Sequence, residues 1–191
     1  AEAAATFPDG AAVVTYLESS VSAWLEALEP DAALELARAV HQGRVEAQDT
    51  AQIPRSGMVL SRSAFAAGHM KESMEQAKNA SLAAAESGLP DLAADGAWLQ
   101  GLAAWRLHDR EGLTDAAGRW GERGALLEAM ATGLTGDPAQ PAAILAASKL
   151  TGTDGVEVQL AAAEVAWMQG GDAATLAGKA AKLADKAGHQ P

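Results

Sequence analysis

Apolar residues recur every three or four positions along almost the whole chain, as they do on one face of an α-helix. No run of five or more residues alternates apolar and polar positions with enrichment in β-branched residues, which is the pattern of a strand. The sequence therefore predicts an all-α protein without a sheet. Its ten expected helices span residues 11–28, 30–41, 56–67, 70–87, 90–107, 110–120, 122–134, 138–149, 154–169 and 172–187.

Short turns built from Gly, Pro, Asp and Thr separate these segments, which is the usual chemistry of helix stops and caps. Connections this short make consecutive helices antiparallel neighbours. Residues 1–10 form a short lead, and residues 11–188 are predicted to be one helical-repeat domain. The least regular stretch, 43–56, contains Pro54 and is the expected joint between the first hairpin and the rest.

One turn signature recurs at positions 68, 108, 136 and 171, which are 40, 28 and 35 residues apart. A recurrence of roughly 30 to 45 residues is typical of stacked helical hairpins. We expect a right-handed α-superhelix of about five antiparallel hairpins, with a compact all-α bundle as the alternative.

The recurrence resembles the tetratricopeptide repeat over residues 57–188. Gly68 and Gly171–Asp172 stand at the turn of that repeat, and Gly101 stands seven residues before His108, where the family has a small residue. Gly57 replaces the family's early aromatic residue. The resemblance implies a concave groove, lined by the first helix of each hairpin, that binds a peptide or the surface of another protein.

Two tryptophans, Trp98 and Trp105, lie seven residues apart and so share one helix face. They either anchor a partner in the groove or fill space between alanine-rich helices. Arg62 and Arg106 would add a basic stripe suited to an acidic or carboxylate-ended segment. The candidate partner-binding residues are Met58, Arg62, Phe65, Trp98, Trp105, Arg106 and Met130.

Composition narrows the possible functions. The formal net charge is −11, and the 14 basic residues are scattered along the sequence, which argues against nucleic acid as a partner. No apolar run is long enough to insert into a membrane. With no cysteine, no helical pair of histidines at metal-ligand spacing and no nucleophile or phosphate-loop motif, we predict no metal, no cofactor and no catalytic residue.

Glu164 is the one carboxylate within an otherwise apolar stretch, where it would be buried and paired, or would face a groove. The leading hypothesis is a non-enzymatic scaffold or adaptor that binds a protein or peptide. The alternatives are an all-α protein that binds a small molecule or cofactor, and a helical domain of a larger cell-envelope enzyme. The alanine-rich start resembles an end left by a signal peptidase, so we expect a periplasmic or otherwise exported protein, with a cytoplasmic one as the alternative. The sequence leaves the oligomeric state open.

Overall fold

The computed structural model describes residues 20–21, 23–25, 27, 29–119, 121–134, 139–168 and 170–186. These residues contain helices and turns and no strand, so the predicted all-α class is confirmed. The predicted lead at 1–10, most of the predicted first helix and the turn at 135–138 lie outside the described residues. The helices are α2 (Pro30–Glu46), α3 (Ile53–Ala66), α4 (Met70–Glu86), α5 (Pro90–Arg106), α6 (Arg110–Ala117), α7 (Gly121–Gly133), α8 (Ala139–Ala146), α9 (Gly152–Met168) and α10 (Ala173–Lys186).

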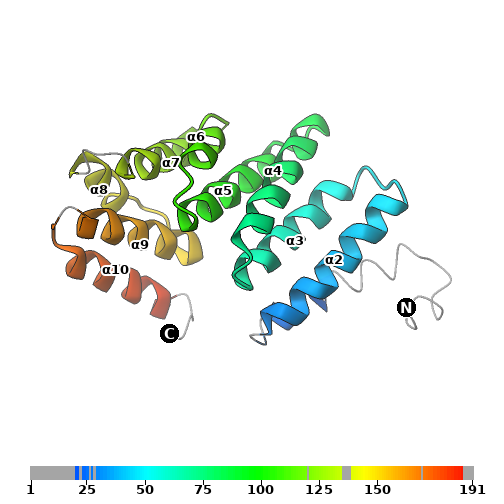
Figure 1. Ribbon diagram of the computed structural model, residues 1–191, viewed down its shortest axis with the longest axis horizontal. Coiled ribbons are helices and arrows are strands. Elements are labelled where there is room, and N and C mark those ends of the chain that lie inside the picture. The colour runs from blue at the N-terminus through cyan, green and yellow to red at the C-terminus, as the bar shows by residue number, and fades with distance from the viewer. Residues whose placement is uncertain are drawn as a thin grey trace. The chain divides into compact units, whose positions relative to one another are not determined.

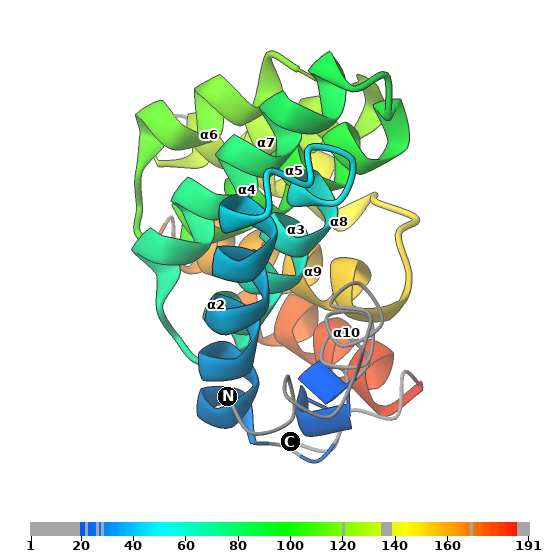
Figure 2. The ribbon, with the colours of Figure 1, turned by 90° about the vertical axis from the view of Figure 1, so that its right-hand side faces the viewer.

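The chain forms two compact units, Ala1–Ala103 and Ala104–Pro191, and α5 contributes to both. In the first unit α2 packs on α3 and α3 packs on α4, so these helices follow one another side by side (Figures 1 and 2). In the second unit α6 packs on α7, α7 on α8, α8 on α9 and α9 on α10, and α7 also reaches α9.

The irregular segment predicted at 43–56 is shorter in the structure. Helix α2 continues to Glu46 and α3 begins at Ile53, with Pro54 in its first turn, where its missing N–H costs no hydrogen bond. The buried guanidinium of Arg44 contacts the Asp49 carboxylate at 2.7 Å and stabilises the turn between the two helices.

Four turns recur at an even spacing along the chain. Gln48, Gly68, Gly88 and His108 all have a left-handed backbone, with φ between 53° and 80°. The N–H of each following residue donates to the carbonyl five positions before it, at 2.8–3.0 Å, which is the Schellman arrangement that ends a helix. The turns predicted at 68, 87–90 and 108 are therefore confirmed. A hairpin takes two of these intervals, which is somewhat longer than the roughly 34 residues of a tetratricopeptide repeat.

The contacts between helices repeat at the same spacing as the turns. The Ser61 hydroxyl on α3 donates to the Ser73 carbonyl on α4, and the Ser81 hydroxyl on α4 donates to the Ala93 carbonyl on α5, both at 2.8 Å. Small buried side chains let the backbones approach closely at these points. A Cβ on Gly96 would lie 2.8 Å from the Ser81 Cβ, so only glycine fits there without movement.

Ion pairs join helices that are two apart in the chain. Arg38 on α2 holds both oxygens of Glu72 on α4, at 2.9 and 2.6 Å, and this hydrogen bonding lowers the pKa of Glu72. Arg62 on α3 lies 3.9 Å from Asp95 on α5. In the first unit, α2 and α3 therefore each interact with the next helix and with the one after it.

Alanine supplies most of the buried apolar residues in the described part of the chain. Alanine allows close helix packing but buries little area, so a few large side chains must supply the rest. Met58, Trp98, Trp105 and Met130 are among the large side chains that do so.

Candidate functional site

The structure buries four of the seven predicted partner-binding residues. Met58, Trp98, Trp105 and Met130 are each at most 4% exposed, so a partner cannot reach them in this arrangement. Their burial agrees with the interpretation that large side chains fill the space between alanine-rich helices. Phe65 is half-buried, and only Arg62 and Arg106 are exposed.

Both exposed arginines already have carboxylate neighbours. The Arg106 Nη2 atom donates to both oxygens of Glu157 on α9, at 2.9 and 2.7 Å, and the Glu157 side chain is largely buried. Among the described residues, the ion pair of Arg62 is the longer contact with Asp95, between two well-exposed side chains. Arg62 belongs to the first unit and Arg106 to the second. The charge of Arg106 is thus neutralised by the Glu157 carboxylate, whereas Arg62 forms a long and exposed ion pair.

A second pair joins the turn after α5 to α9. The His108 Nε2 atom lies 3.0 Å from Glu164 Oε1, and the His108 ring meets Trp105 edge to face with the ring centroids 6.2 Å apart. Glu164 is therefore paired, as one alternative predicted, but it is partly exposed and not buried. His108 has a left-handed backbone, and its ring contacts both Trp105 at the end of α5 and Glu164 on α9.

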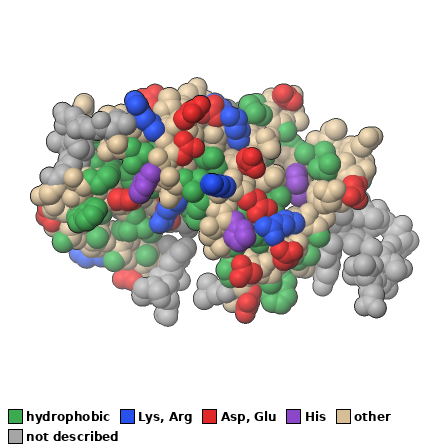
Figure 3. All heavy atoms as spheres, viewed as in Figure 1, with side chains coloured by type: hydrophobic (Ala, Val, Ile, Leu, Met, Phe, Trp, Pro, Cys, Tyr) green, Lys and Arg blue, Asp and Glu red, His purple; other side chains and the backbone are tan. Residues whose placement is uncertain are grey.

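One face of α9 carries exposed apolar side chains. Trp167 is 73% exposed, Met168 44% and Leu160 38%. Together with Glu157 and Glu164, these positions fall within an arc of about 100° on the helix, and described residues elsewhere around α9 are mostly buried. We call Leu160, Glu164, Trp167 and Met168 the α9 face. Figure 3 shows hydrophobic side chains with a few acidic groups among them over the region of α8 to α10.

Sequence reasoning found Glu164 but missed the apolar members of the α9 face. The stretch 158–168 is so rich in apolar residues that its exposed side could not be separated from its buried side by spacing alone. The signal that was present is the placement of two large side chains, Trp167 and Met168, shortly before a glycine turn, where fewer neighbours can cover them.

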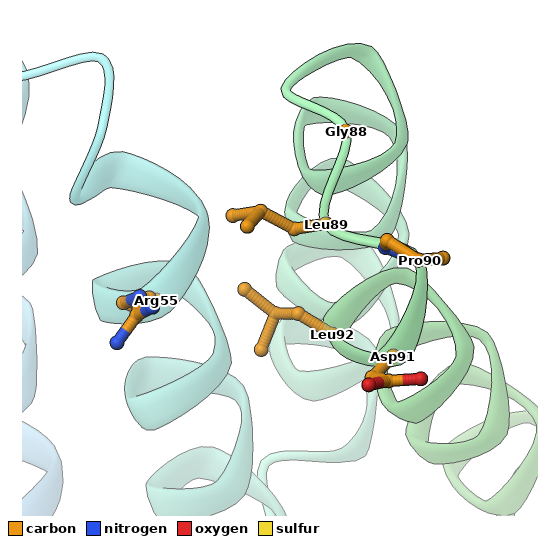
Figure 4. A pocket seen from close by; sticks show the side chains of 6 residues that line it. All are labelled: Arg55, Gly88, Leu89, Pro90, Asp91 and Leu92. Atoms are coloured by element: carbon orange, nitrogen blue, oxygen red, sulfur yellow. The ribbon is translucent and has the colours of Figure 1, made fainter.

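A shallow pocket of about 310 Å³ lies between α3 and the turn that precedes α5 (Figure 4). Leu89 and Leu92 point toward α3, where Arg55 lies, while Pro90 points away. One cation beside two leucines could hold a carboxylate with an apolar neighbour. Asp91 also lines the pocket and would repel such a ligand, so we assign the pocket no role.

The described residues hold no group of three or more His, Asp or Glu side chains that could bind a metal ion. None of the described helices combines the length and the apolar character needed to cross a bilayer. The predicted export of the protein stays a prediction.

Comparisons with protein-family models, with curated proteins and with solved structures found no match to this chain. The resemblance to the tetratricopeptide repeat therefore stays a prediction, and the assignment of function depends on the chain's own geometry.

Proposed function

We propose that the protein is a non-enzymatic binding module, built of stacked helical hairpins, that captures another protein on the α9 face. The observation that carries the proposal is the exposure of Trp167, at 73%, beside Leu160 and Met168 on the same side of one helix. Tryptophan is among the residues that most often dominate binding energy at interfaces. Exposed apolar side chains grouped on one face are typical of interaction sites.

The regularity of the first unit supports stacked hairpins over an irregular bundle. Turns and buried hydroxyl contacts recur there at one common spacing, and ion pairs join helices two apart. A repeat of this kind leaves one side of each hairpin free, which is how helical-repeat proteins present binding surfaces. The right-handed superhelix is part of this proposal.

The partner segment we favour is an amphipathic helix with aliphatic residues on one face and Lys or Arg at its ends. From Leu160 to Met168 the α9 face is about 12 Å long, which matches about two turns of a partner helix. The net charge of −11 attracts a basic segment over long range. An acidic segment is less suitable, because Arg62 and Arg106 already contact Asp95 and Glu157.

The proposal is tested with a displayed library of amphipathic helical peptides, from which binders of the wild-type protein are selected. Replacement of Trp167 by alanine should weaken the selected peptides by about 30-fold, the size of a hot-spot loss. The matched control is Trp24→Ala, because Trp24 is also exposed but lies in the first unit. This control should leave peptide affinity unchanged, and both variants should keep the wild-type circular dichroism spectrum.

Two results would contradict the proposal. One is equal peptide affinity for wild type and Trp167→Ala. The other is dimerisation of the wild type at micromolar concentration that Trp167→Ala abolishes, measured by light scattering. In that case the α9 face would join two copies of this chain.

A further inference from the structure

The second unit also contains a concave site, which lies away from the α9 face. A pocket of about 380 Å³ is bounded by the segment that joins α8 to α9, by α9 and by α10. Gln159 on α9 contributes to it, and this residue lies about 130° around the helix from the centre of the α9 face. Its lining is Ala146, Ser148, Lys149, Leu150, Thr151, Gln159, Lys179, Lys182, Leu183 and Lys186.

Four of the chain's six lysines line this one pocket, and no acidic residue does. The two remaining lysines, Lys71 and Lys78, lie on α4 in the first unit. Among the described residues, no carboxylate forms an ion pair with Lys149, Lys179 or Lys182. In a chain with a net charge of −11, this is a local concentration of uncompensated positive charge.

The four lysines come together because three of them share one face of α10 and the fourth lies on the segment that joins α8 to α9. Lys179, Lys182 and Lys186 are spaced by three and four positions, so they share one face of α10. Lys149 stands a full helix earlier in the sequence and reaches the same pocket from the segment before α9. The basic residues that are scattered along the sequence are gathered here by the fold.

Stabilisation of a helix end does not explain the cluster. Cations are favourable near a helix C-terminus, and this accounts for Lys186 in the last turn of α10. Lys179 lies about two turns earlier, and Lys149 lies outside any helix. Four like charges around one hollow repel one another, and the repulsion falls when an anion binds among them.

Polar neighbours add directional groups to the charge. The Ser148 oxygen accepts from the Leu150 N–H at 3.3 Å, which leaves its hydroxyl hydrogen free to donate. Gln159 is only 4% exposed, and its amide nitrogen donates to the Leu145 carbonyl at 3.3 Å. Its Oε1 atom accepts no hydrogen bond from a described residue, although most buried polar atoms in proteins are paired. Gln159 thus contributes a polar side chain to the pocket wall, held in place by its hydrogen bond to Leu145.

We propose that this pocket binds a small phosphorylated molecule. A phosphate monoester carries a charge of about −1.5 to −2 at neutral pH and three acceptor oxygens, which suits several ammonium groups and the hydroxyls of Ser148 and Thr151. A single carboxylate would leave most of the positive charge uncompensated. The volume of about 380 Å³ exceeds what one phosphate fills, so the ligand carries a second phosphate or a polar body.

The test uses calorimetry at about 0.15 M salt, where screening suppresses unspecific attraction. Inorganic pyrophosphate is the probe, and citrate is the comparison with similar charge but no phosphate. We expect saturable pyrophosphate binding and at least about tenfold weaker binding of citrate. The double variant Lys179→Gln/Lys182→Gln should raise the pyrophosphate Kd at least about tenfold, since each lost charge-assisted hydrogen bond is worth about that factor.

The chain offers a charge-matched control, Lys71→Gln/Lys78→Gln, which should keep the wild-type Kd. Melting curves of both double variants should show folded protein. Absence of saturable binding, equal binding of citrate, or an equal loss in the control would each overturn the proposal. So would binding only to phosphatidic acid vesicles or to an oligonucleotide, since either would make the cluster a surface for a macromolecule. None of these outcomes depends on Trp167, so the test is independent of the proposed protein partner.

Discussion

Single glycines set how closely the helices of the first unit approach. A Cβ at Gly96 would lie 2.8 Å from the Ser81 Cβ and 3.0 Å from the Ala77 carbonyl oxygen, and neither atom ends a flexible side chain. Gly57 is in a similar position, 3.2 Å from the Ala80 Cβ. An aromatic side chain at position 57 would therefore collide with α4, which occupies that space.

The Gly96→Ala variant should therefore destabilise the protein. We expect the free energy of unfolding to fall by about 1–3 kcal/mol, the usual cost of overpacking. The control is Gly178→Ala on α10, where the added Cβ would meet no atom within 4 Å apart from its chain neighbours and its own helix backbone. It should raise the free energy of unfolding by up to about 1 kcal/mol through helix propensity. Urea denaturation measures both, and a loss at Gly178 equal to that at Gly96 would contradict the close packing of α4 on α5.

His41 gives the first unit a pH dependence. Ser56 uses its hydroxyl hydrogen on the Ile53 carbonyl, so His41 Nδ1 must donate to the Ser56 oxygen, at 2.9 Å. Burial lowers the pKa of His41 below its ordinary value of 6.5. As the pH falls below 6.5, His41 takes up a proton more readily in the unfolded chain than in the folded chain. The free energy of unfolding therefore falls as the pH falls below 6.5.

The His41→Asn variant should remove this part of the pH dependence while keeping a donor toward Ser56. Melting temperatures compared at about pH 7.5 and 5.5, on either side of the histidine pKa, should fall more for wild type than for the variant. Glu72, whose pKa is also lowered, acts at more acidic pH and leaves this window nearly unaffected. An equal fall in both proteins would show that His41 is protonated in the folded state as readily as in the unfolded state.

At the scale of elements, two arginines that look alike in sequence have different surroundings. Arg106 ties the end of α5 to α9 through contacts with both oxygens of a largely buried carboxylate. Arg62 makes one long contact in the open. Removing one partner of a shielded pair leaves the other charge uncompensated, whereas exposed pairs contribute little.

We therefore expect Arg106→Gln to lower the free energy of unfolding by about 1–2 kcal/mol, less than for a fully buried pair because Arg106 is partly exposed. Arg62→Gln should change it by less than about 0.5 kcal/mol. Adding Glu157→Gln to Arg106→Gln should restore part of the loss, because the uncompensated carboxylate is then absent. Chemical denaturation of the four proteins measures this, and equal effects of the two arginine changes would contradict the assignment.

Sequence patterns predicted the elements well and the surfaces poorly. The 3.6-residue period and the glycine turns indicated the helices because both signals are local. Exposure is not local: Trp105 and Trp167 have similar neighbours in sequence, yet one is buried and the other is largely exposed. Likewise, the face formed by Lys179, Lys182 and Lys186 can be read along α10, but the approach of Lys149 depends on how α8 connects to α9.

At the scale of the whole molecule, charge is unevenly distributed. Residues 1–103 contain 6 basic and 14 acidic residues, and residues 104–191 contain 8 and 11, so most of the net charge of −11 belongs to the first unit. Excess charge of one sign destabilises a compact chain through self-repulsion. The Arg38–Glu72 pair relieves this repulsion only locally, because it neutralises one carboxylate among many.

Salt should therefore stabilise the protein. Raising NaCl from about 10 mM to about 200 mM shortens the screening length from about 30 Å to about 7–8 Å, which reduces long-range repulsion more than it weakens close pairs. The melting temperature should rise over this range for wild type, and rise further for Arg106→Gln, which has no close Arg106–Glu157 pair for salt to weaken. A melting temperature that falls with salt would show that attractive pairs outweigh the net charge.

The turns at Gln48, Gly68, Gly88 and His108 are evenly spaced, and each one reverses the direction of the chain. The effect of a deletion therefore depends on whether it removes an odd or an even number of helices. Excising residues 69–88 would join the end of α3 directly to the start of α5, yet α5 would then run in the opposite direction. Excising the double interval 69–108 would restore the original direction. We therefore expect this part of the chain to tolerate insertions and deletions of whole hairpins and not of single helices, even though a single helix is the unit in which the turn chemistry repeats.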